Sequence, residues 1–492
     1  MLNIGNHREC FFDDYLLDTE KTTAELRLHE LVRREVVMTH GEAWEGNGCE
    51  YHNFFFDDAF PGVDGAHPEG VYRMYYIGRQ LPNGSKDCKP EHELVVCYAE
   101  SPDCIHWTKP VLSISDFHGS KENNIVLGSE FGCEFDNFMV FRDDDPACPA
   151  DERYKGISSY QNKQNPKPNV LYCYFSADGI HFRRGRVIAD EDQGTYDTLN
   201  IVFRDERAGL YRAYVRGFHN TPVGTNRHVG IRDVRYFESR DGVNWTKSEL
   251  LDFGDAEDYQ LYTNCVFPYY RAPQMLLGLP TRYMEYAAWS ETFDELCGAK
   301  ERMTVEPRLG LAVTDCMFMC SRDGKKFFRF EDAFLRPAPE NGENWLYGDC
   351  YPARGLVETP SGIEGEPNEI SMFIPHHHFT NSPKELIRYT LRLDGFASLY
   401  AGRGKEETVT TKPFVYDGSV LRINFATSAR GYLRFTLRRG EETVESLDTF
   451  GNSVDRRVVF PAGAVAAFSG KEVVMEIRMR DADLYSLRFA EK

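Results

Sequence analysis

Acidic residues precede several short β-rich segments of this chain. Glu50, Asp136, Asp197 and Asp349 each lie immediately before such a segment. Carboxyl groups that meet in pairs can act as general acid and general base, or as acid and nucleophile, on a glycosidic bond. Glu50, Asp136 and Asp197 are therefore our candidate catalytic residues, provided that the fold brings them to one place.

Side chains that could hold a sugar occur at related positions. Arginine and amide groups bind hydroxyls, and indole rings pack against the C–H face of a sugar ring. His376 is the first of three consecutive histidines, which alternate between the faces of a strand, so we expect no metal site there. The expected substrate-binding residues are Trp44, Arg79, Gln161, Arg216, Tyr262, Asn264, Arg282, Trp345, Asp349 and His376.

A repeated turn signature indicates the elements that position these residues. Its full form is Ser-x-Asp-Gly-x-x-aromatic, in which Asp-Gly makes a hairpin turn and the aromatic residue packs on the sheet. Copies occur at 101–107, 176–182, 239–245 and 321–327, and a shortened copy at 393–396. Trp107 and Trp245 belong to these copies, so we expect them in the core.

Each copy closes a group of β-rich segments. The groups are 51–56, 71–77 and 94–100; 137–141, 153–160 and 171–175; 199–203, 210–217 and 234–238; 263–268, 274–280 and 309–320; and 350–357, 369–374 and 386–393. Four-stranded antiparallel units repeated radially form a propeller. The sequence therefore predicts an all-β fold with a five-bladed β-propeller over 1–400, and a short helix within 286–300.

The last part of the chain has a different pattern. Apolar and polar residues alternate in short segments separated by turns, which is typical of a small β-sandwich. We place this domain at 401–492, with strands at 420–426, 431–437, 457–460, 473–480 and 484–490.

Propeller geometry explains why the candidate residues should share a site. The first strand of each blade lines the central tunnel, and the second strand runs antiparallel to it. The start of the first strand and the end of the second therefore lie on the same face of the propeller. Residues at these two places in every blade converge on one funnel.

Composition restricts the partners. The net charge is −20, from 57 basic and 77 acidic residues, and no basic cluster suggests a nucleic-acid surface. No signal peptide or apolar run long enough for a membrane span is visible. The 13 cysteines include no Cys-x-x-Cys pair. We expect a cytoplasmic protein that binds carbohydrate, with no cofactor; a cation such as calcium and the oligomeric state stay open.

The repeats, together with Leu393-Asp-Gly-Phe-Ala-Ser-Leu399, Thr411-Lys-Pro-Phe414 and Ala482-Asp-Leu-Tyr-Ser-Leu-Arg-Phe489, carry a family resemblance. The chain resembles the glycoside hydrolase superfamily of invertases, levansucrases, arabinanases and β-xylosidases, and within it a bacterial branch with a C-terminal sandwich. The resemblance implies catalytic carboxylates from blades one, two and three, which match Glu50, Asp136 and Asp197 by position.

The residue types depart from that pattern. Glutamate stands in blade one and aspartate in blade three, the reverse of the usual order, and the Asn-Asp-Pro-Asn motif of invertases is missing. Asp349 or Asp258 could replace one member of the set.

The expected activity is hydrolysis of a glycosidic bond, exo-acting and with a furanoside favoured. Asp197 would be the general acid, Glu50 the base or nucleophile, and Asp136 would orient the sugar. A sialidase-like enzyme or a glycoside phosphorylase is the first alternative, since three arginines could bind a carboxylate or phosphate. A non-catalytic carbohydrate-binding propeller is the second.

Overall fold

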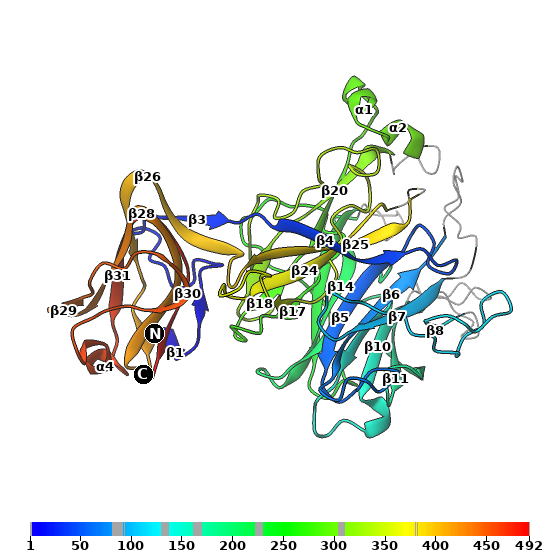
Figure 1. Ribbon diagram of the computed structural model, residues 1–492, viewed down its shortest axis with the longest axis horizontal. Coiled ribbons are helices and arrows are strands. Elements are labelled where there is room, and N and C mark those ends of the chain that lie inside the picture. The colour runs from blue at the N-terminus through cyan, green and yellow to red at the C-terminus, as the bar shows by residue number, and fades with distance from the viewer. Residues whose placement is uncertain are drawn as a thin grey trace.

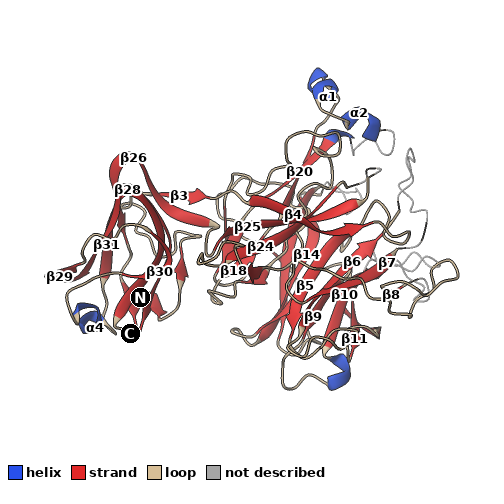
Figure 2. Ribbon diagram, viewed as in Figure 1, coloured by secondary structure: helices blue, strands red, loops and turns tan. Residues whose placement is uncertain are grey.

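The computed structural model describes residues 2–80, 92, 94–128, 137–160, 170–221, 230–303, 310–378, 380 and 382–491. Most regular structure in these ranges is β-strand (Figures 1 and 2). None of the helices described there is long and apolar enough to span a membrane. A smaller unit that contains both termini lies beside a larger one (Figure 1).

The larger unit is the predicted five-bladed β-propeller. Each blade is a 4-stranded antiparallel sheet. The blades consist of β5 (Glu50–Asp57), β6 (Val71–Gly78), β7 (Val95–Ser101) and β8 (Ile125–Leu127); β9 (Met139–Arg142), β10 (Tyr154–Tyr160), β11 (Val170–Ser176) and β12 (Arg183–Ala189); β13 (Ile201–Asp205), β14 (Leu210–His219), β15 (Ile231–Ser239) and β16 (Glu249–Leu250); β17 (Phe267–Pro268), β18 (Leu276–Gly278), β21 (Met319–Ser321) and β22 (Phe327–Arg329); and β23 (Val357–Thr359), β24 (Glu369–His376), β25 (Lys384–Arg392) and β4 (Val32–His40).

Blade four carries an insertion that projects from the propeller (Figure 1). Strands β19 (Thr281–Glu285) and β20 (Ala312–Cys316) form a separate 2-stranded sheet. Between them lie the short helices α1 (Glu291–Glu295) and α2 (Ala299–Arg302). The helix expected within 286–300 is therefore two shorter ones, and the strand expected over 309–320 is divided between β20 and β21.

The turn signature has a second role, which is to lock neighbouring blades together. In the second copy, Asp178 Oδ1 accepts hydrogen bonds from the N–H groups of Ile180 and His181, both at 2.8 Å. The turn carbonyls are bonded by blade one: Arg73 Nη1 donates to the Asp178 oxygen, and Tyr75 Oη to the Gly179 oxygen, both at 2.8 Å. Arg212 and Tyr214 of blade three bond the fourth copy in the same way.

The propeller closes with a strand from near the N-terminus. β4 pairs antiparallel with β25 as the outermost strand of blade five, with Lys384 opposite His40 and Leu386 opposite Met38. The strand is exposed over Val32–Val36 and buried at Met38 and His40. Closure thus joins residues more than 300 positions apart in the sequence and brings the end of β4 next to blade one.

The smaller unit is a β-sandwich built from both ends of the chain. The long strands β26 (Ala397–Thr410), β28 (Val420–Arg439) and β31 (Val474–Ala490) form its centre; β29 (Glu442–Glu445), β30 (Asn452–Arg457), β27 (Phe414–Tyr416) and helix α4 (Ala464–Phe468) complete the C-terminal part. From the N-terminus, β1 (Leu2–Gly5) pairs with β27, β2 (Glu9–Cys10) with β31, and β3 (Glu25–Leu28) with β26.

These pairings differ from the expected division at residue 400. The N-terminal segment packs mainly with the sandwich, because Ile4, Phe11, Leu16 and Leu17 belong to its apolar core, whereas Cys10 and Phe12 belong to the core of the propeller. The segments expected at 420–426 and 431–437 are one continuous strand, β28, and those expected at 473–480 and 484–490 are one strand, β31. The strand expected at 457–460 lies earlier, at β30.

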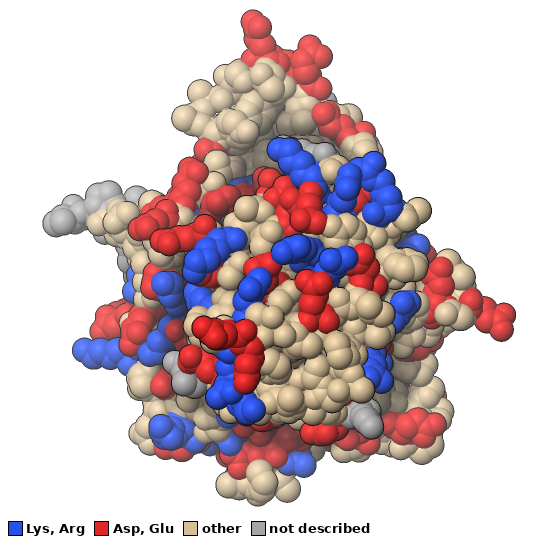
Figure 3. Space-filling model, turned by 90° about the vertical axis from the view of Figure 1, so that its left-hand side faces the viewer, with Lys and Arg blue, Asp and Glu red and all other residues tan. Residues whose placement is uncertain are grey.

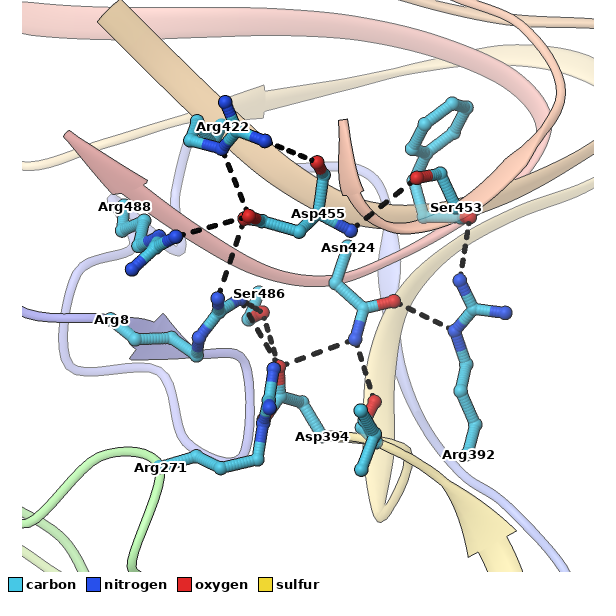
Figure 4. A network of polar contacts seen from close by, with 12 residues as sticks. Arg8, Arg271, Arg392, Asp394, Arg422, Asn424, Ser453, Asp455, Ser486 and Arg488 are labelled. Atoms are coloured by element: carbon cyan, nitrogen blue, oxygen red, sulfur yellow. Dashed lines mark hydrogen bonds and ion pairs between the residues drawn. The ribbon is translucent and has the colours of Figure 1, made fainter. Parts of the chain in front are cut away.

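Asp394 joins the propeller to the sandwich (Figure 4). This residue of the shortened fifth turn is fully buried, at 0% exposure. Its carboxylate contacts Arg8 at 3.2 Å and accepts hydrogen bonds from Arg271 at 2.7 Å and Ser486 at 2.8 Å. Tyr269 Oη, at 2.7 Å, and Asn424 Nδ2, at 3.2 Å, complete its partners. Burial alone would raise the pKa of Asp394, but Arg8 and Arg271 hold it below the usual value.

The outer face of the sandwich mixes charges of both signs. Figure 3 shows Lys and Arg interspersed with Asp and Glu over this face, with uncharged surface between them. The sandwich also contains ion pairs, among them Arg434–Asp448, at 2.7 Å, and Arg438–Glu476, at 3.1 Å. This view shows no single-sign field of the kind that attracts a nucleic acid.

Candidate active site

The first candidate carboxylate, Glu50, is held by residues from blades one and five. It begins β5 and is 3% exposed. Arg79, just after the end of β6, forms an ion pair with its Oε1. His378, in the loop after β24, places Nε2 3.4 Å from its Oε2. The sequence argument put Glu50 and Arg79 on one face of blade one, and the two side chains are in contact.

A buried lysine orients His378. Lys384 begins β25, is 0% exposed, and its Nζ donates to His378 Nδ1. Because Nδ1 accepts, the proton of the neutral ring lies on Nε2, facing Glu50. Burial lowers the pKa of His378 well below its usual value, which keeps the ring neutral. Burial also lowers the pKa of Lys384 to about 8, while Glu50 opposes this shift.

The second candidate carboxylate, Asp197, repeats this arrangement in blade three. It lies before β13, and its Oδ2 pairs with Arg216 near the end of β14. Oδ1 of Asp197 is buried and has no hydrogen-bond partner among the described residues. The guanidinium of Arg216 lies 4.7 Å from the ring centre of Tyr262. Asp197, Arg216 and Tyr262 therefore form one contiguous group.

A cluster of four tyrosines links the two groups. The rings of Tyr262 and Tyr351 stack with centres 5.6 Å apart, and those of Tyr51 and Tyr351 with centres 6.5 Å apart. Tyr347 Oη donates to Tyr262 Oη at 2.6 Å. All four are at most 7% exposed. We call Tyr51, Tyr262, Tyr347 and Tyr351 the tyrosine cluster.

Both carboxylate groups border this cluster. Burial, followed by the charges of the other three cluster tyrosines and Glu50, raises the pKa of Tyr351 well above its usual value. On the other side, Arg216 interacts with Tyr262 and Tyr51. Tyr351 Oη is buried and has no hydrogen-bond partner among the described residues. Tyr351 thus adds a neutral hydroxyl donor to the tyrosine cluster.

Backbone strain marks the same end of the blades. Tyr51 in blade one (φ 59°), Tyr196 in blade three (φ 53°), Cys265 in blade four (φ 43°) and Cys350 in blade five (φ 57°) all have positive φ. Non-glycine residues adopt this conformation rarely, and such strain gathers at functional sites. Here the strained residue lies directly beside Glu50, Asp197, Asn264 and Asp349, respectively.

Asn264 serves a different purpose from the one expected. Its Nδ2 donates to the carbonyl of Tyr214 in blade three at 3.1 Å, and it is 1% exposed. Asn53 donates in the same way to Phe138 of blade two, at 2.8 Å, and Asn137 to Tyr196 of blade three, at 2.7 Å. These asparagines join adjacent blades around the axis, so Asn264 is bonded to backbone and not directed at a ligand.

Several other expected binding residues are bonded to protein groups. Trp44 Nε1 donates to Asn124 at 2.7 Å, and Trp345 Nε1 to the carbonyl of Ala338 at 2.9 Å. Arg282 is bound by Asp315 of the insertion, with Nε 2.9 Å from Oδ1. The loop containing Trp345 turns back on Asp349, whose Oδ2 accepts from the Leu346 N–H at 3.0 Å.

The histidine run is used differently from the expectation. His376 Nε2 bonds to Tyr389 Oη at 2.9 Å, and burial lowers the pKa of His376 to about 3. His377 has φ 64°, which interrupts the alternation of the strand. As a result His378, not His376, faces Glu50.

The remaining candidates fall into two groups. Asp258 is 2.8 Å from His219 Nε2, with its side chain 52% exposed. Asp136 and Gln161 lie outside the described residues. Sequence reasoning missed Lys384 and the tyrosines other than Tyr262, and it favoured His376 over His378. A signal was present, because Tyr51 directly follows Glu50 and Tyr351 lies two residues after Asp349.

No protein-family model and no curated protein sequence matches the chain. Solved structures of similar fold include an N-acetylgalactosamine deacetylase from F. plautii, with 10% identity, TM-score 0.44, and coverage of 73% of this chain and 94% of that one. A fructofuranosidase from Schwanniomyces occidentalis has 11% identity, TM-score 0.40, and coverage of 93% and 98%. An α-L-arabinanase from Penicillium chrysogenum has 9% identity, TM-score 0.37, and coverage of 78% and 94%.

Proposed function

We propose that this chain is a glycoside hydrolase whose site is formed by Glu50, Asp197 and the tyrosine cluster. The observation that carries the proposal is the pair of carboxylates at equivalent places in blades one and three. Each is held by an arginine of the following strand, and both border the same tyrosines. Two carboxylates around one sugar position are the minimum for acid–base or nucleophilic glycoside cleavage.

Two polar atoms of this site support a hydroxyl-rich ligand. Asp197 Oδ1 is a buried acceptor and Tyr351 Oη a buried donor, and neither has a protein partner in the described part of the chain. Buried polar groups are nearly always hydrogen-bonded, so such atoms call for an explanation. Sugar hydroxyls can both donate and accept, so a bound sugar would satisfy both atoms.

The finer assignment keeps the roles drawn from the sequence. Asp197 acts as general acid towards the leaving oxygen, and Glu50 acts as base or nucleophile, with Arg79 and His378 fixing its orientation. Asp136 orients the sugar. An exo-acting enzyme is favoured because a funnel suits cleavage at a chain end, and a furanoside is favoured because of the family resemblance.

A glycan screen with matched variants tests the proposal. The purified chain is assayed against aryl glycosides and an oligosaccharide panel, with and without inorganic phosphate. Glu50→Gln and Asp197→Asn are expected to lower turnover by about 10²–10⁴-fold. Asp205→Asn is the control, because Asp205 pairs with Arg212 at 2.7 Å at the opposite end of the same two strands.

The outcomes separate the alternatives. Turnover that requires phosphate identifies a phosphorylase. Sugar binding without turnover, unchanged in Glu50→Gln and Asp197→Asn, identifies a non-catalytic binding propeller and contradicts the proposal. If Asp197 is the acid, Asp197→Asn should lose more activity on substrates with poor leaving groups than on activated aryl glycosides, because only the former need protonation.

A further inference from the structure

Two histidines and a cysteine meet where blade five closes against blade one. His40 ends β4, Cys49 immediately precedes β5, and His52 lies within β5. One ligand atom from each side chain lies within 4.8 Å of the other two. Their exposures are 1%, 0% and 1%. The closing strand therefore creates this cluster, and all three side chains are buried.

Hydrogen bonds fix the ring of His40 with a lone pair directed into the cluster. Its Nδ1 is 3.2 Å from the carbonyl oxygen of Lys384, so Nδ1 donates and Nε2 is the unprotonated nitrogen. Nε2 faces Nε2 of His52 at 2.9 Å. A histidine that donates its other ring N–H to a carbonyl is the usual arrangement of a metal ligand.

Packing holds both rings in place. Tyr76 stacks on His52 with ring centres 5.1 Å apart and an angle of 12°, and meets His40 edge-on at 5.0 Å. Burial lowers the pKa of His40 to about 3 and that of His52 well below its usual value, so both rings are neutral ligands. His52 Nδ1 is buried without a hydrogen-bond partner among the described residues. Within the described residues, only one of the two ring nitrogens of His52 thus has a hydrogen-bond partner.

A cavity borders one member of the cluster, His40. This cavity of about 290 Å³ lies between the loop after His40 and the loop before β25. Its lining includes His40, Glu42, Asn47, Gln80, Thr380 and Ser382. An ion could therefore approach His40 without opening the propeller.

We propose that His40, Cys49 and His52 bind a zinc ion. Two imidazoles and one thiolate match the preference of zinc, whereas calcium and magnesium select oxygen ligands. Zinc holds nitrogen at about 2.0–2.1 Å and sulfur at about 2.3 Å, so its ligand atoms lie within about 4 Å of one another. The observed spread needs only small side-chain movements to meet that geometry. Three protein ligands leave one position for water or a small ligand.

Binding is balanced by loss of one proton. Cys49 gives up its Sγ proton to solvent, and its thiolate binds the cation. The proton that His52 Nε2 donates to His40 Nε2 moves to His52 Nδ1, which has no partner in the described part of the chain, and this frees both Nε2 atoms for the ion. Without the ion, burial raises the pKa of the Cys49 thiol well above its usual value and buried Glu45 adds to that shift, whereas Lys384 and Lys109, which lies 2.7 Å from Glu45, oppose it. The ion would connect the closing strand β4 to β5, and its ligand Cys49 directly precedes Glu50. This site does not depend on the proposed hydrolase activity.

Metal titration of the untagged full chain tests the proposal. The protein is stripped with a chelator and titrated with Co²⁺ and then Zn²⁺. We expect one equivalent of Co²⁺ to bind with a thiolate-to-cobalt absorption band and tetrahedral d–d bands, and Zn²⁺ to displace it. Zn²⁺ should also raise the Tm of the parent.

Two variants locate the ion. Cys49→Ser should lose the thiolate band and the rise in Tm, whereas Cys173→Ser, a buried cysteine of blade two, should keep both. X-ray absorption of the zinc-loaded parent should show nitrogen and one sulfur in the first coordination shell. Failure of the parent to bind one equivalent, or full binding by Cys49→Ser, overturns the proposal. The parent measurement decides even if Cys49→Ser does not fold.

Discussion

Asp394→Asn removes the charge at the centre of the contact between propeller and sandwich, with almost no change of shape. In the parent, Arg8 and Arg271 both contact this fully buried carboxylate, with side-chain exposures of 7% and 17%. The asparagine removes the fully buried counter-charge of both guanidinium groups, which leaves Arg8 only Asp455, at 3.5 Å, and Arg271 only Glu358, at 3.9 Å. It also turns one acceptor oxygen into a donor that faces other donors.

The expected cost follows from burial. Breaking a buried ion pair by removing one partner costs about 3–5 kcal/mol. Asp455→Asn is the control from the same network, since Asp455 contacts Arg422 at 2.9 Å and Arg488 at 3.0 Å but its side chain is 30% exposed. More exposed pairs of that kind contribute about 0–1 kcal/mol.

Urea denaturation at neutral pH, followed by tryptophan fluorescence and circular dichroism, measures both variants against the parent. Asp394→Asn should lower the free energy of unfolding by about 3–5 kcal/mol, and Asp455→Asn by about 1 kcal/mol or less. Equal effects of the two variants, or a loss below about 0.5 kcal/mol for Asp394→Asn, a value typical of neutral surface changes, would refute the view that buried charge at Asp394 holds the two units together.

Three further predictions follow from the blades and the site. Gly179→Ala should destabilise the protein by about 1–3 kcal/mol in thermal or urea unfolding, because φ is +73° and the new Cβ would lie 2.7 Å from Arg73 Nη1. Gly209→Ala, at φ +67° with open space around the new Cβ, should lower the free energy of unfolding by less. Equal losses of unfolding free energy in the two variants would contradict the role of the contact with Arg73. Burial raises the pKa of Asp103, but hydrogen bonds from His106, Ile105 and Ser101 outweigh burial and lower this pKa to about 2. The stabilisation by the Asp103 carboxylate is therefore present above about pH 4 and is lost as the pH falls towards 2. Between pH 5 and pH 3, about the range in which such carboxylates titrate, Asp103→Asn should show a smaller drop in urea midpoint than the parent, and an identical drop would show that this carboxylate contributes nothing. Tyr351→Phe should leave the free energy of unfolding within about 0.5 kcal/mol of the parent but reduce glycoside turnover, and a variant that is destabilised with unchanged turnover would show that the hydroxyl serves the fold.

The propeller was predictable because each blade carries its own local signal. Asp103, Asp178, Asp241 and Asp323 form turns from hydrogen bonds within a few residues, so the sequence alone locates the hairpins. The closing strand β4 has no such mark, since its partner β25 is distant in the sequence. The pairing of β1, β2 and β3 with the sandwich was missed for the same reason.

The candidate site was predictable to the extent that strand polarity determines it. Arg79 contacts Glu50 and Arg216 contacts Asp197 because both members of each pair lie at the same end of two antiparallel strands. The sequence could not show that Asp315 binds Arg282, because both lie in an extra 2-stranded sheet that the repeated blade pattern does not predict.

The identity of the inward histidine depended on a single backbone angle. A regular strand would direct His376 and His378 to the same face, and the positive φ of His377 changes the direction of the chain. Lys384 carried no signal, because a buried lysine is rare and its partner His378 lies across a loop.

The most direct test of the central claim asks whether Glu50 and Asp197 act on one bound sugar. Turnover of the best substrate from the glycan screen is measured for the parent, Glu50→Gln, Asp197→Asn and the double variant. Residues that act as a unit are strongly non-additive, so the double variant should lose about as much activity as the worse single variant. Losses that multiply, or a single variant with parental turnover, would show that the two carboxylates do not share a reaction.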